Sequence, residues 1–327
     1  MNAATAVAHP NIALVKYWGK QDEALNLPAT GSLSLTLDVL PTVTTVTPGD
    51  GPGEDTFELN GRPVTGAPLD RVRRFLDLVR ARAGVRDHAH VVSRNTVPTG
   101  AGLASSASGF AALATAASAA YGLPLDVPSL SRLARRGSGS AARSVVPGLA
   151  VWHAGDDATS FAEPVAGPAL AMVLATVDAG PKPVPSREAM RRTAATSPYY
   201  PAWLATTHDC LEQAVAACAR GDLPRLGRLA EANALRMHAA IQACDPPVRY
   251  LAPGSVRLFD RVALLRAEGV DVWATADAGP NVVAVCRPED ATRVAGALAQ
   301  DAAVTIAGAG PGARLVGAPA IASGIAS

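Results

Sequence analysis

A glycine-rich segment that leads into an alanine-rich run could bind phosphate. Residues 98–110 have the sequence PTGAGLASSASGF, and a helical pattern continues to about Tyr121. Glycines let the backbone approach a ligand closely, and the N-terminus of the following helix offers unpaired N–H groups and a positive dipole end. No GKS or GKT closes the segment, so it is not a Walker A motif, and Ser105 and Ser106 would make any side-chain contact with phosphate or Mg²⁺. A packing turn before a helix is the alternative explanation.

Residues 135–144, with the sequence RRGSGSAARS, form a second candidate binding loop. Its guanidinium and hydroxyl groups suit an anion with several oxygen atoms, because arginine forms paired hydrogen bonds with carboxylates and phosphates. A solvated linker is the alternative. In DAGPN, Asp277 stands between two apolar segments, where a lone carboxylate needs a partner or a catalytic role. A β-turn that begins at this Asp would also explain its position.

Lysine is rare in this chain. Of the 29 basic side chains only Lys16, Lys20 and Lys182 are lysines, and the others are arginines. Because a lysine is a compact point charge and an arginine a planar fork, a chain that uses arginine elsewhere is expected to keep lysine where a compact charge is needed. All three are therefore site candidates, with chance as the alternative. Tyr17 and Trp18 follow an apolar strand pattern, and burial is their ordinary explanation.

Composition argues against several classes of function. The formal net charge is +1 over 327 residues and no long block of like charges occurs, so neither nucleic acid nor a membrane surface is an expected partner. The longest apolar runs fall short of the roughly 18 residues that a transmembrane helix needs. The first residues lack the pattern of a targeting peptide, so we expect a cytoplasmic protein. The four cysteines have no metal-binding spacing, which favours buried thiols over a zinc site or disulfides.

The pattern along the chain predicts an α+β fold with two domains. A change in composition at residues 178–185 marks the expected boundary between domains 1–180 and 181–327. The expected elements are, in chain order, strands within 6–47, a hairpin around Asn60-Gly61, a helix over 69–79, a strand over 88–92, a helix after the glycine-rich segment, a helix over 130–136, a strand over 170–176, two helices within 202–243, a helix over 255–268, strands over 270–276 and 282–286, and a helix over 288–300.

In combination, these segments resemble the diphosphomevalonate decarboxylases of the GHMP kinase superfamily. The resemblance spans residues 11 to about 285 and is carried, in the order of the family, by NIALVKYWGK, LPATGSLSLTLD, NTVPTGAGLASSASGFAAL, RRGSGSAARS, PSREAM with TSPYY, EANALRMHA and DAGPN. It implies the GHMP kinase fold: an N-terminal domain like domain 2 of ribosomal protein S5, which carries the nucleotide loop, and a C-terminal α+β sandwich that carries the catalytic Asp. Substrate is then expected between the domains, and the protein is expected to be a homodimer.

The resemblance also implies a reaction. ATP, with Mg²⁺, would phosphorylate the tertiary 3-hydroxyl of (R)-5-diphosphomevalonate, and loss of phosphate with CO₂ would leave isopentenyl diphosphate. Phosphorylation creates a good leaving group, whose departure draws electrons from the carboxylate as the C–C bond breaks. Such a reaction needs cations and hydrogen bonds placed around clustered anionic groups. The two candidate loops carry groups of this kind.

Individual residues receive roles from the resemblance. Asp277 is expected to act beside the 3-hydroxyl as a base or an orienting group, and Arg143 to hold the substrate carboxylate, while Lys16 and Lys182 add positive potential. The remaining expected substrate-binding residues are Tyr17, Trp18, Gly19, Lys20, Arg71, Ser138, Gly139, Ser140, Ala141, Ala142, Ser186 and Arg187. Those expected at ATP are Gly100, Ala101, Gly102, Leu103, Ala104, Ser105, Ser106 and Ser108, of which Ser105 and Ser106 would approach Mg²⁺.

Two positions depart from the family pattern near the expected anionic pocket. Gln21 stands where a basic residue usually follows YWGK, and Gly31 replaces a small polar residue before SLS. Loss of a charge and a hydroxyl there would weaken binding of the terminal phosphate. The alternative function is therefore decarboxylation of phosphomevalonate, or phosphorylation of the 3-hydroxyl of a mevalonate derivative without decarboxylation. A non-catalytic nucleotide-binding protein would lack the catalytic side chains, and none of them is missing.

Overall fold

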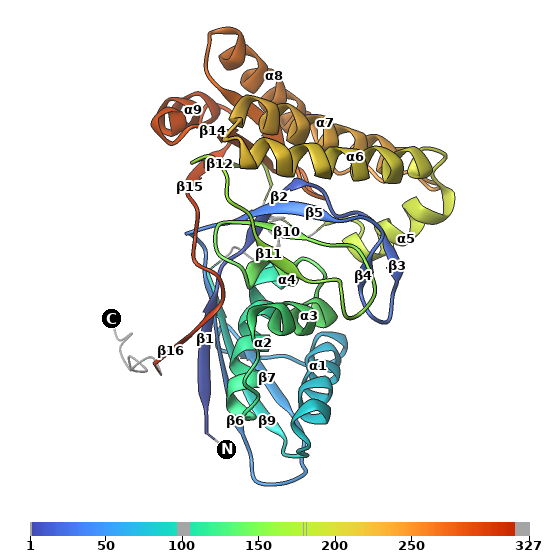
Figure 1. The fold of residues 1–327 in the computed structure, drawn as a ribbon, viewed down its shortest axis with the longest axis vertical. Coiled ribbons are helices and arrows are strands. Elements are labelled where there is room, and N and C mark those ends of the chain that lie inside the picture. The colour runs from blue at the N-terminus through green and yellow to red at the C-terminus, as the bar shows by residue number, and fades with distance from the viewer. Residues whose placement is uncertain (1, 97–104, 179, 181, 318–327) are drawn as a thin grey trace.

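The computed structural model describes residues 2–96, 105–178, 180 and 182–317. Figure 1 shows an N-terminal sheet with its helices at one end of the long axis, a second sheet in the middle, and a C-terminal sheet with long helices at the other end. The mixture of helices and sheets confirms the predicted α+β class.

The N-terminal layer consists of β1 (Ala4–Ala8), β6 (Thr42–Pro48), β7 (Thr56–Leu59), β8 (Arg62–Pro63), α1 (Ala67–Ala83), β9 (Ala89–Asn95), α2 (Ser105–Ala120) and β16 (Arg314–Val316). Its strand order is β16-β1-β6-β9-β7-β8. Phe75 of α1 and Leu113 of α2 pack with Val46 of β6 in the core of this layer. Asn60 and Gly61 have positive φ angles of 52° and 77°, which form the predicted tight turn between β7 and β8.

The middle layer consists of β2 (Asn11–Val15), the short hairpin β3 (Lys20–Asp22) and β4 (Leu27–Pro28), β5 (Ser32–Thr36), α3 (Val127–Gly137), α4 (Ala141–Ser144), β10 (Leu149–Trp152) and β11 (Ala162–Pro164). The sheet order is β11-β10-β5-β2. Every residue of β2, β5 and β10 is buried, because neighbouring elements cover both faces of this sheet. The polar residues on these strands are consequently fixed inside the molecule.

The C-terminal layer consists of β12 (Ala171–Thr176), α5 (Ser186–Thr196), α6 (Tyr200–Ala219), α7 (Leu223–Gln242), α8 (Pro253–Ala267), β13 (Val272–Thr275), β14 (Val282–Cys286), the 3₁₀ turn η1 (Pro288–Asp290), α9 (Ala291–Leu298) and β15 (Ala303–Ala307). Its strand order is β13-β14-β12-β15. Helix α7 contacts both β2 of the middle sheet and β13. As predicted, α6 ends near Gly221, and the Asp222 side chain caps the start of α7 by accepting from Arg225 N.

Sheet pairing crosses residue 180 in two places. Strand β12 pairs with β14 and β15, and β16 returns to pair with β1. The division into 1–180 and 181–327 stays a prediction. The sequence patterns did not predict α4, α5, β10, β11, β15 or β16. Helix α4 has only one turn and β16 three residues, so neither is long enough to produce a periodic pattern.

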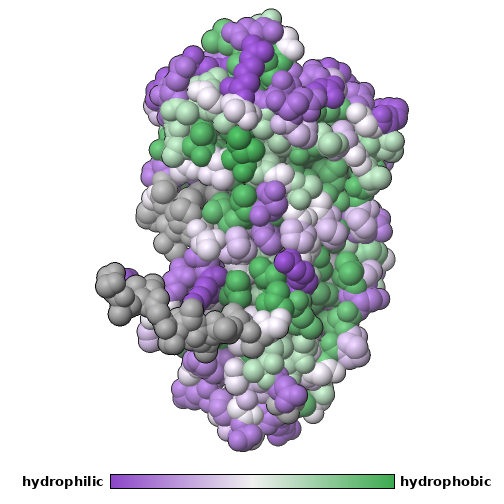
Figure 2. Space-filling model, turned by 90° about the vertical axis from the view of Figure 1, so that its left-hand side faces the viewer, coloured by the Kyte–Doolittle hydropathy of each residue, from purple (hydrophilic) through white to green (hydrophobic). Residues whose placement is uncertain are grey.

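The surface carries no large one-sided apolar face in the view of Figure 2, where polar residues predominate at the two ends and apolar residues are interspersed along the middle. Among the described residues, no helix combines the length and the apolar character required to cross a bilayer. The four cysteines are free and buried, as predicted, and burial raises the pKa of Cys210 and of Cys218 to about 11.

Candidate active site

A cavity of about 350 Å³ lies where the middle layer meets the C-terminal layer. Most of the predicted site residues line it, although they come from segments far apart in the chain. These are Lys16, Tyr17, Trp18, Lys20, Arg71, Ser106, Ser138, Gly139, Ser140, Arg143, Lys182, Ser186, Arg187 and Asp277. All three lysines of the protein are among them.

An ion pair between Lys16 and Asp277 joins the two layers inside the cavity. Lys16 directly follows β2, and Asp277 lies in the turn between β13 and β14, with 2.7 Å between Nζ and Oδ1. The ammonium also donates to Ala13 O at 2.8 Å, and the backbone N–H of Lys16 donates to Asn233 Oδ1 at 2.7 Å. The Lys16 side chain is 2% exposed and that of Asp277 30%, so the carboxylate keeps an accessible side toward the cavity.

Burial and neighbouring charges act in opposite directions on this pair. Burial alone would raise the pKa of Asp277, but Lys16, Arg143 and Lys182 together hold it below its ordinary value. Burial lowers the pKa of Lys16, and Asp277 opposes that shift. The carboxylate is therefore ionised at neutral pH, surrounded by cations rather than by other acids. Gly279 N donates to Asp277 O, which is the three-residue pattern of a γ-turn and not the β-turn that the sequence left open.

Arg143 is held in a fixed position by two side chains of the middle sheet. Its Nε donates to Asn11 Oδ1 at 3.1 Å and its Nη1 to Ser32 Oγ at 2.7 Å, and the guanidinium lies 5.7 Å from the centre of the Trp152 ring. Burial lowers its pKa to about 10, so the group stays charged at neutral pH. Within the described chain Nη2 has no protein partner, which leaves it available to an anionic ligand.

A second group of cations, Lys20, Arg71 and Arg187, lies together at the cavity. Burial lowers the pKa of Lys20, and the nearby Arg187 and Arg71 lower it further, while Glu23 opposes them. Burial and the positive charge of Arg187 also lower the pKa of Arg71, to about 10. Arg71 donates to Gly137 O through Nε and Nη2, and stacks over Phe110 at 4.5 Å. In the described part of the chain, these three close cations have Glu23 as a carboxylate neighbour, and together they form a site for a multiply charged anion.

Small and hydroxyl-bearing residues connect the two groups of charges. Ser106 Oγ lies 3.2 Å from Ser138 Oγ, which brings the start of α2 against the loop that precedes α4. A Cβ atom on Gly139 would lie 2.8 Å from Tyr17 Oη, so glycine permits this contact. Burial raises the pKa of Tyr17, which therefore keeps its proton and can donate a hydrogen bond. Near the other wall, Lys182 Nζ lies 3.2 Å from Ser186 Oγ.

Some predicted site residues do not line the cavity. Ala141 and Ala142 are fully buried, and Gly19 packs against the hydroxyl end of Tyr200. Ser108 is also fully buried, with its Oγ 2.7 Å from Thr42 Oγ1. The predicted ATP residues Gly100 to Ala104, and the Ser105 side chain, lie outside the described residues.

Four polar residues near the cavity were missed by sequence reasoning. Asn11 and Ser32 hold Arg143, Asn26 contacts Lys20, and the buried His238 lies beside Lys16 and Asp277. Burial lowers the pKa of His238 to about 4, so its ring is neutral. An available signal was the placement of Asn11 and Ser32 within apolar strand patterns, where a polar residue needs a partner.

The described residues of this site fit magnesium as part of a nucleotide complex. The described residues contain no cluster of three or more His, Cys, Asp or Glu side chains that could hold a metal ion. Mg²⁺ usually keeps several waters and is bound through one or two protein oxygens and substrate phosphates. The Ser106 hydroxyl at the cavity is an oxygen ligand of that kind. The site residues are thus compatible with an ion that arrives with ATP.

The amino-acid sequence matches two family models. Residues 8–162 match the diphosphomevalonate decarboxylase-like N-terminal domain, and residues 172–308 match the mevalonate 5-diphosphate decarboxylase C-terminal domain. The diphosphomevalonate decarboxylase of Candida albicans is 36% identical over 304 residues, which cover 86% of this chain and 84% of that protein.

Solved structures show the same relationship. Mevalonate diphosphate decarboxylase from Staphylococcus aureus superposes with a TM-score of 0.93 at 40% identity, over 97% of this chain and 98% of that chain. A structure described as MDDEF in complex with MVAPP, AMPPCP and magnesium has a TM-score of 0.91 at 44% identity, over 96% and 99% of the two chains. The expected GHMP kinase fold is confirmed by these neighbours. The chain therefore belongs to the diphosphomevalonate decarboxylase family.

Proposed function

We propose that this protein catalyses the ATP-dependent decarboxylation of (R)-5-diphosphomevalonate to isopentenyl diphosphate, with release of ADP, phosphate and CO₂. The observation that carries the proposal is the Asp277 carboxylate, ion-paired with Lys16 at 2.7 Å and partly exposed in a cavity that is otherwise rich in cations. A relative with MVAPP, an ATP analogue and magnesium bound supports the same substrates for this chain.

The two groups of charges suit the two ends of this substrate. Lys20, Arg71 and Arg187 would bind the diphosphate, because three cations match a multiply charged anion. Arg143 would hold the carboxylate through Nη2, since Asn11 and Ser32 already fix Nε and Nη1. The 3-hydroxyl would then lie between Arg143 and Asp277. These two residues are neighbours, because the positive charge of Arg143 lowers the pKa of Asp277.

In the proposed reaction, phosphoryl transfer to the 3-hydroxyl is followed by loss of phosphate and CO₂. Asp277 orients the 3-hydroxyl or accepts its proton as the hydroxyl oxygen forms a bond to the γ-phosphorus of ATP, and the bond to ADP breaks. The new phosphate leaves C3 with the electron pair of its C–O bond. The bond between the carboxyl carbon and C2 breaks, its electrons form the C2–C3 double bond, and CO₂ departs. Lys16, Lys182 and Arg143 stabilise the charges that move during these steps.

Nucleotide binding belongs to the start of α2 in this proposal. Ser106 is the described hydroxyl at the cavity that would face the phosphates, and with Ser105 it would approach Mg²⁺. The N-terminus of a helix of 16 residues favours anions there. A homodimer and a cytoplasmic location stay predictions from the sequence.

The two departures from the family pattern lie away from the cavity. Gln21 Nε2 donates to Gly155 O at 2.5 Å, and neither Gln21 nor Gly31 lines the cavity. A Cβ atom on Gly31 would lie 2.5 Å from Leu211 Cδ2 and 2.9 Å from Trp152 O, so a larger side chain there would point into protein. Lys20, Arg71 and Arg187 line the cavity although the chain departs from the family pattern at these two positions, which favours the diphosphate over the monophosphate.

The test is to incubate the protein with ATP, Mg²⁺ and either diphosphomevalonate or phosphomevalonate. We expect equimolar ADP, phosphate and CO₂, with a kcat/KM at least tenfold higher for the diphosphate. ADP without CO₂ would show a kinase that stops at the phosphorylated intermediate. Preference for the monophosphate would support the alternative substrate.

A further inference from the structure

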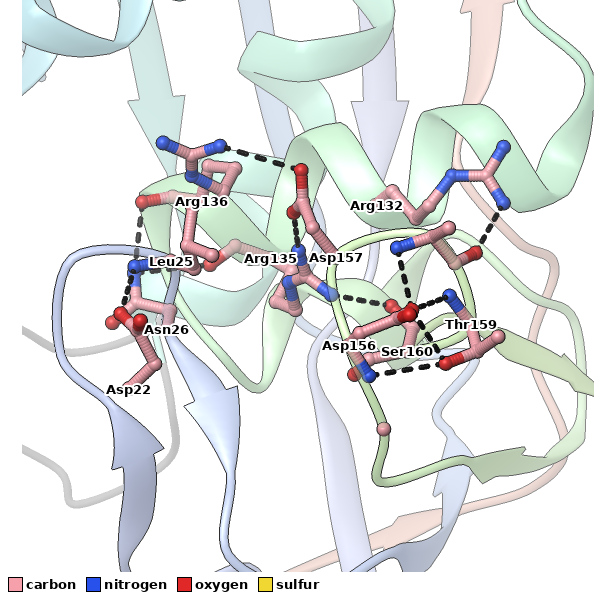
Figure 3. Close-up of polar contacts among 12 residues, drawn as sticks. Asp22, Leu25, Asn26, Arg132, Arg135, Arg136, Asp156, Asp157, Thr159 and Ser160 are labelled. Atoms are coloured by element: carbon pink, nitrogen blue, oxygen red, sulfur yellow. Dashed lines mark hydrogen bonds and ion pairs between the residues drawn. The ribbon is translucent and has the colours of Figure 1, made fainter.

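Asn26 connects a cation of the cavity to the end of a helix. It lies at the tip of the hairpin between β3 and β4 with a positive φ of 53°, and it is 4% exposed. Its Oδ1 accepts from Lys20 Nζ at 2.7 Å. Its Nδ2 donates to Arg136 O at 2.8 Å and to Arg135 O at 3.1 Å, as Figure 3 shows. Both ends of one amide are therefore used, one as an acceptor and the other as a donor.

The carbonyls that Asn26 contacts belong to the last turn of α3. A helix C-terminus carries a partial negative charge and unpaired carbonyl groups, which disfavour a nearby anion. The next carbonyl, Gly137 O, accepts from Arg71 at 2.7 Å. Asn26 and Arg71 together thus occupy three consecutive carbonyls, immediately before the serine-containing residues 138–140 that line the cavity.

The helix itself is anchored on its other side. Arg135 is fully buried, donates to Ser160 O at 2.7 Å and forms an ion pair with Asp157, and Arg136 Nη1 lies 3.9 Å from the same carboxylate. Figure 3 shows these contacts between α3 and residues 156–160. Because the helix is fixed in this way, the amide of Asn26 can fix Lys20 relative to it.

We propose that Asn26 is a positioning residue, which holds Lys20 and the end of α3 in place for the phosphorylated end of the substrate. This inference rests on the proposed function. An amide accepts from the ammonium through its oxygen and donates to two carbonyls through its NH₂ group, whereas a carboxylate has no hydrogen to donate. An aspartate here would place a second carboxylate beside Lys20, which already pairs with Glu23 at 3.1 Å, and would face the negative helix end. Asparagine tolerates the positive φ as well.

The test uses Asn26→Asp, which keeps size and shape. We expect the Kd for inorganic pyrophosphate, measured by calorimetry, and the KM for diphosphomevalonate to rise at least tenfold, while kcat changes less than threefold. Gln21→Glu is the matched control, because it adds the same charge on the same hairpin away from the cavity, and its Kd should change less than twofold. An unchanged pyrophosphate Kd in Asn26→Asp, or an equal rise in the control, overturns the inference.

Two further variants keep the inference testable if Asn26→Asp does not fold. Asn26→Gly suits the positive φ and removes the amide without adding charge, so we expect a rise of at least threefold in the pyrophosphate Kd. In a Lys20→Met background the effect of Asn26→Asp should be smaller than in the wild type, because the two residues act together. If the effects of Asn26→Asp and Lys20→Met on the pyrophosphate Kd are fully additive, Asn26 does not act through Lys20. Pyrophosphate binding needs no turnover, so a wild type that binds it but releases no CO₂ contradicts the proposed reaction and leaves this inference standing.

Discussion

Lys16 Nζ and Asp277 Oδ1 lie 2.7 Å apart, although 261 residues separate them in the chain. The pair connects the end of β2 in the middle sheet with the turn between β13 and β14 in the C-terminal sheet. Because Lys16 is almost completely buried, its charge requires this partner, and the carboxylate is kept ionised in return. One contact thus joins the two layers and also prepares the proposed catalytic group.

Replacement of the carboxylate by an amide tests that role. Asp277→Asn keeps the shape of the side chain, and we expect ATP affinity to remain within a few-fold of the wild type. We expect kcat to fall by about 10²–10⁴, the usual contribution of a positioned acid or base. The control is Asp271→Asn. Asp271 directly precedes β13 and forms an exposed ion pair with Arg287, so this change should leave kcat unchanged. Near-normal kcat in Asp277→Asn would contradict the assignment.

The pH profile tests the coupling between the two residues. In the wild type, the cations outweigh burial and hold the pKa of Asp277 below its ordinary value, so loss of its charge does not limit the rate at mildly acidic pH. Lys16→Met removes the strongest of these cations, and burial then raises the pKa of the carboxyl. We expect the acid limb of kcat/KM to move to higher pH by at least about one unit.

The control for this profile is Lys20→Met, which also removes one buried lysine from the cavity but does so beside Arg71 and Arg187. It should raise KM and leave the acid limb in place. An acid limb in Lys16→Met that stays where the wild type has it, in profiles measured from about pH 3 to pH 9, would show that Lys16 does not set the charge of Asp277.

Arg143 is predicted to need its planar fork. The three N–H groups of a lysine share a single nitrogen, so a lysine lacks the separate Nε, Nη1 and Nη2 positions with which Arg143 contacts Asn11 Oδ1, contacts Ser32 Oγ and faces a carboxylate. For Arg143→Lys we expect kcat/KM to fall by about 10²-fold. Arg132→Lys is the control, since Arg132 also makes two hydrogen bonds but lies outside the cavity, and steady-state kinetics should show no comparable loss. Equal effects in the two variants would contradict a special role for residue 143.

The sequence predicted local structure well, because its signals are local. Apolar spacing indicated α1 and the pair α6 and α7, and Asn60-Gly61 indicated a hairpin turn. The rarity of lysine also identified three residues that line one cavity. A pairing across 261 residues, by contrast, leaves no trace in spacing.

Other features of the site depend on which way a side chain points. The sequence motifs predicted both Arg143 and Ser108 as site residues. Arg143 lines the cavity, whereas Ser108, two positions beyond Ser106 on α2, faces Thr42 in the interior. Successive residues of a helix point in different directions, so a contiguous motif cannot lie wholly at a ligand. Asn26 was missed because its three hydrogen-bond partners come from two separate segments.

The segment between β15 and β16, residues 308–313, is predicted to hold α4 in place from the far side. Gly310 N donates to Thr36 O at 2.8 Å, and Ala313 N donates at 3.1 Å to the carbonyl of Ser144, which ends the helix that carries Arg143. A Cβ atom on Gly312 would lie 2.3 Å from Val145 O, a backbone atom that cannot rotate away. We expect Gly312→Ala to lower the free energy of unfolding by about 1–3 kcal/mol in urea titrations, and to lower kcat/KM as α4 shifts. Gly317→Ala, where a Cβ meets nothing within 4 Å, should change neither. If the two variants behave alike, this segment does not support the helix, and the position of Arg143 depends on Asn11 and Ser32 alone.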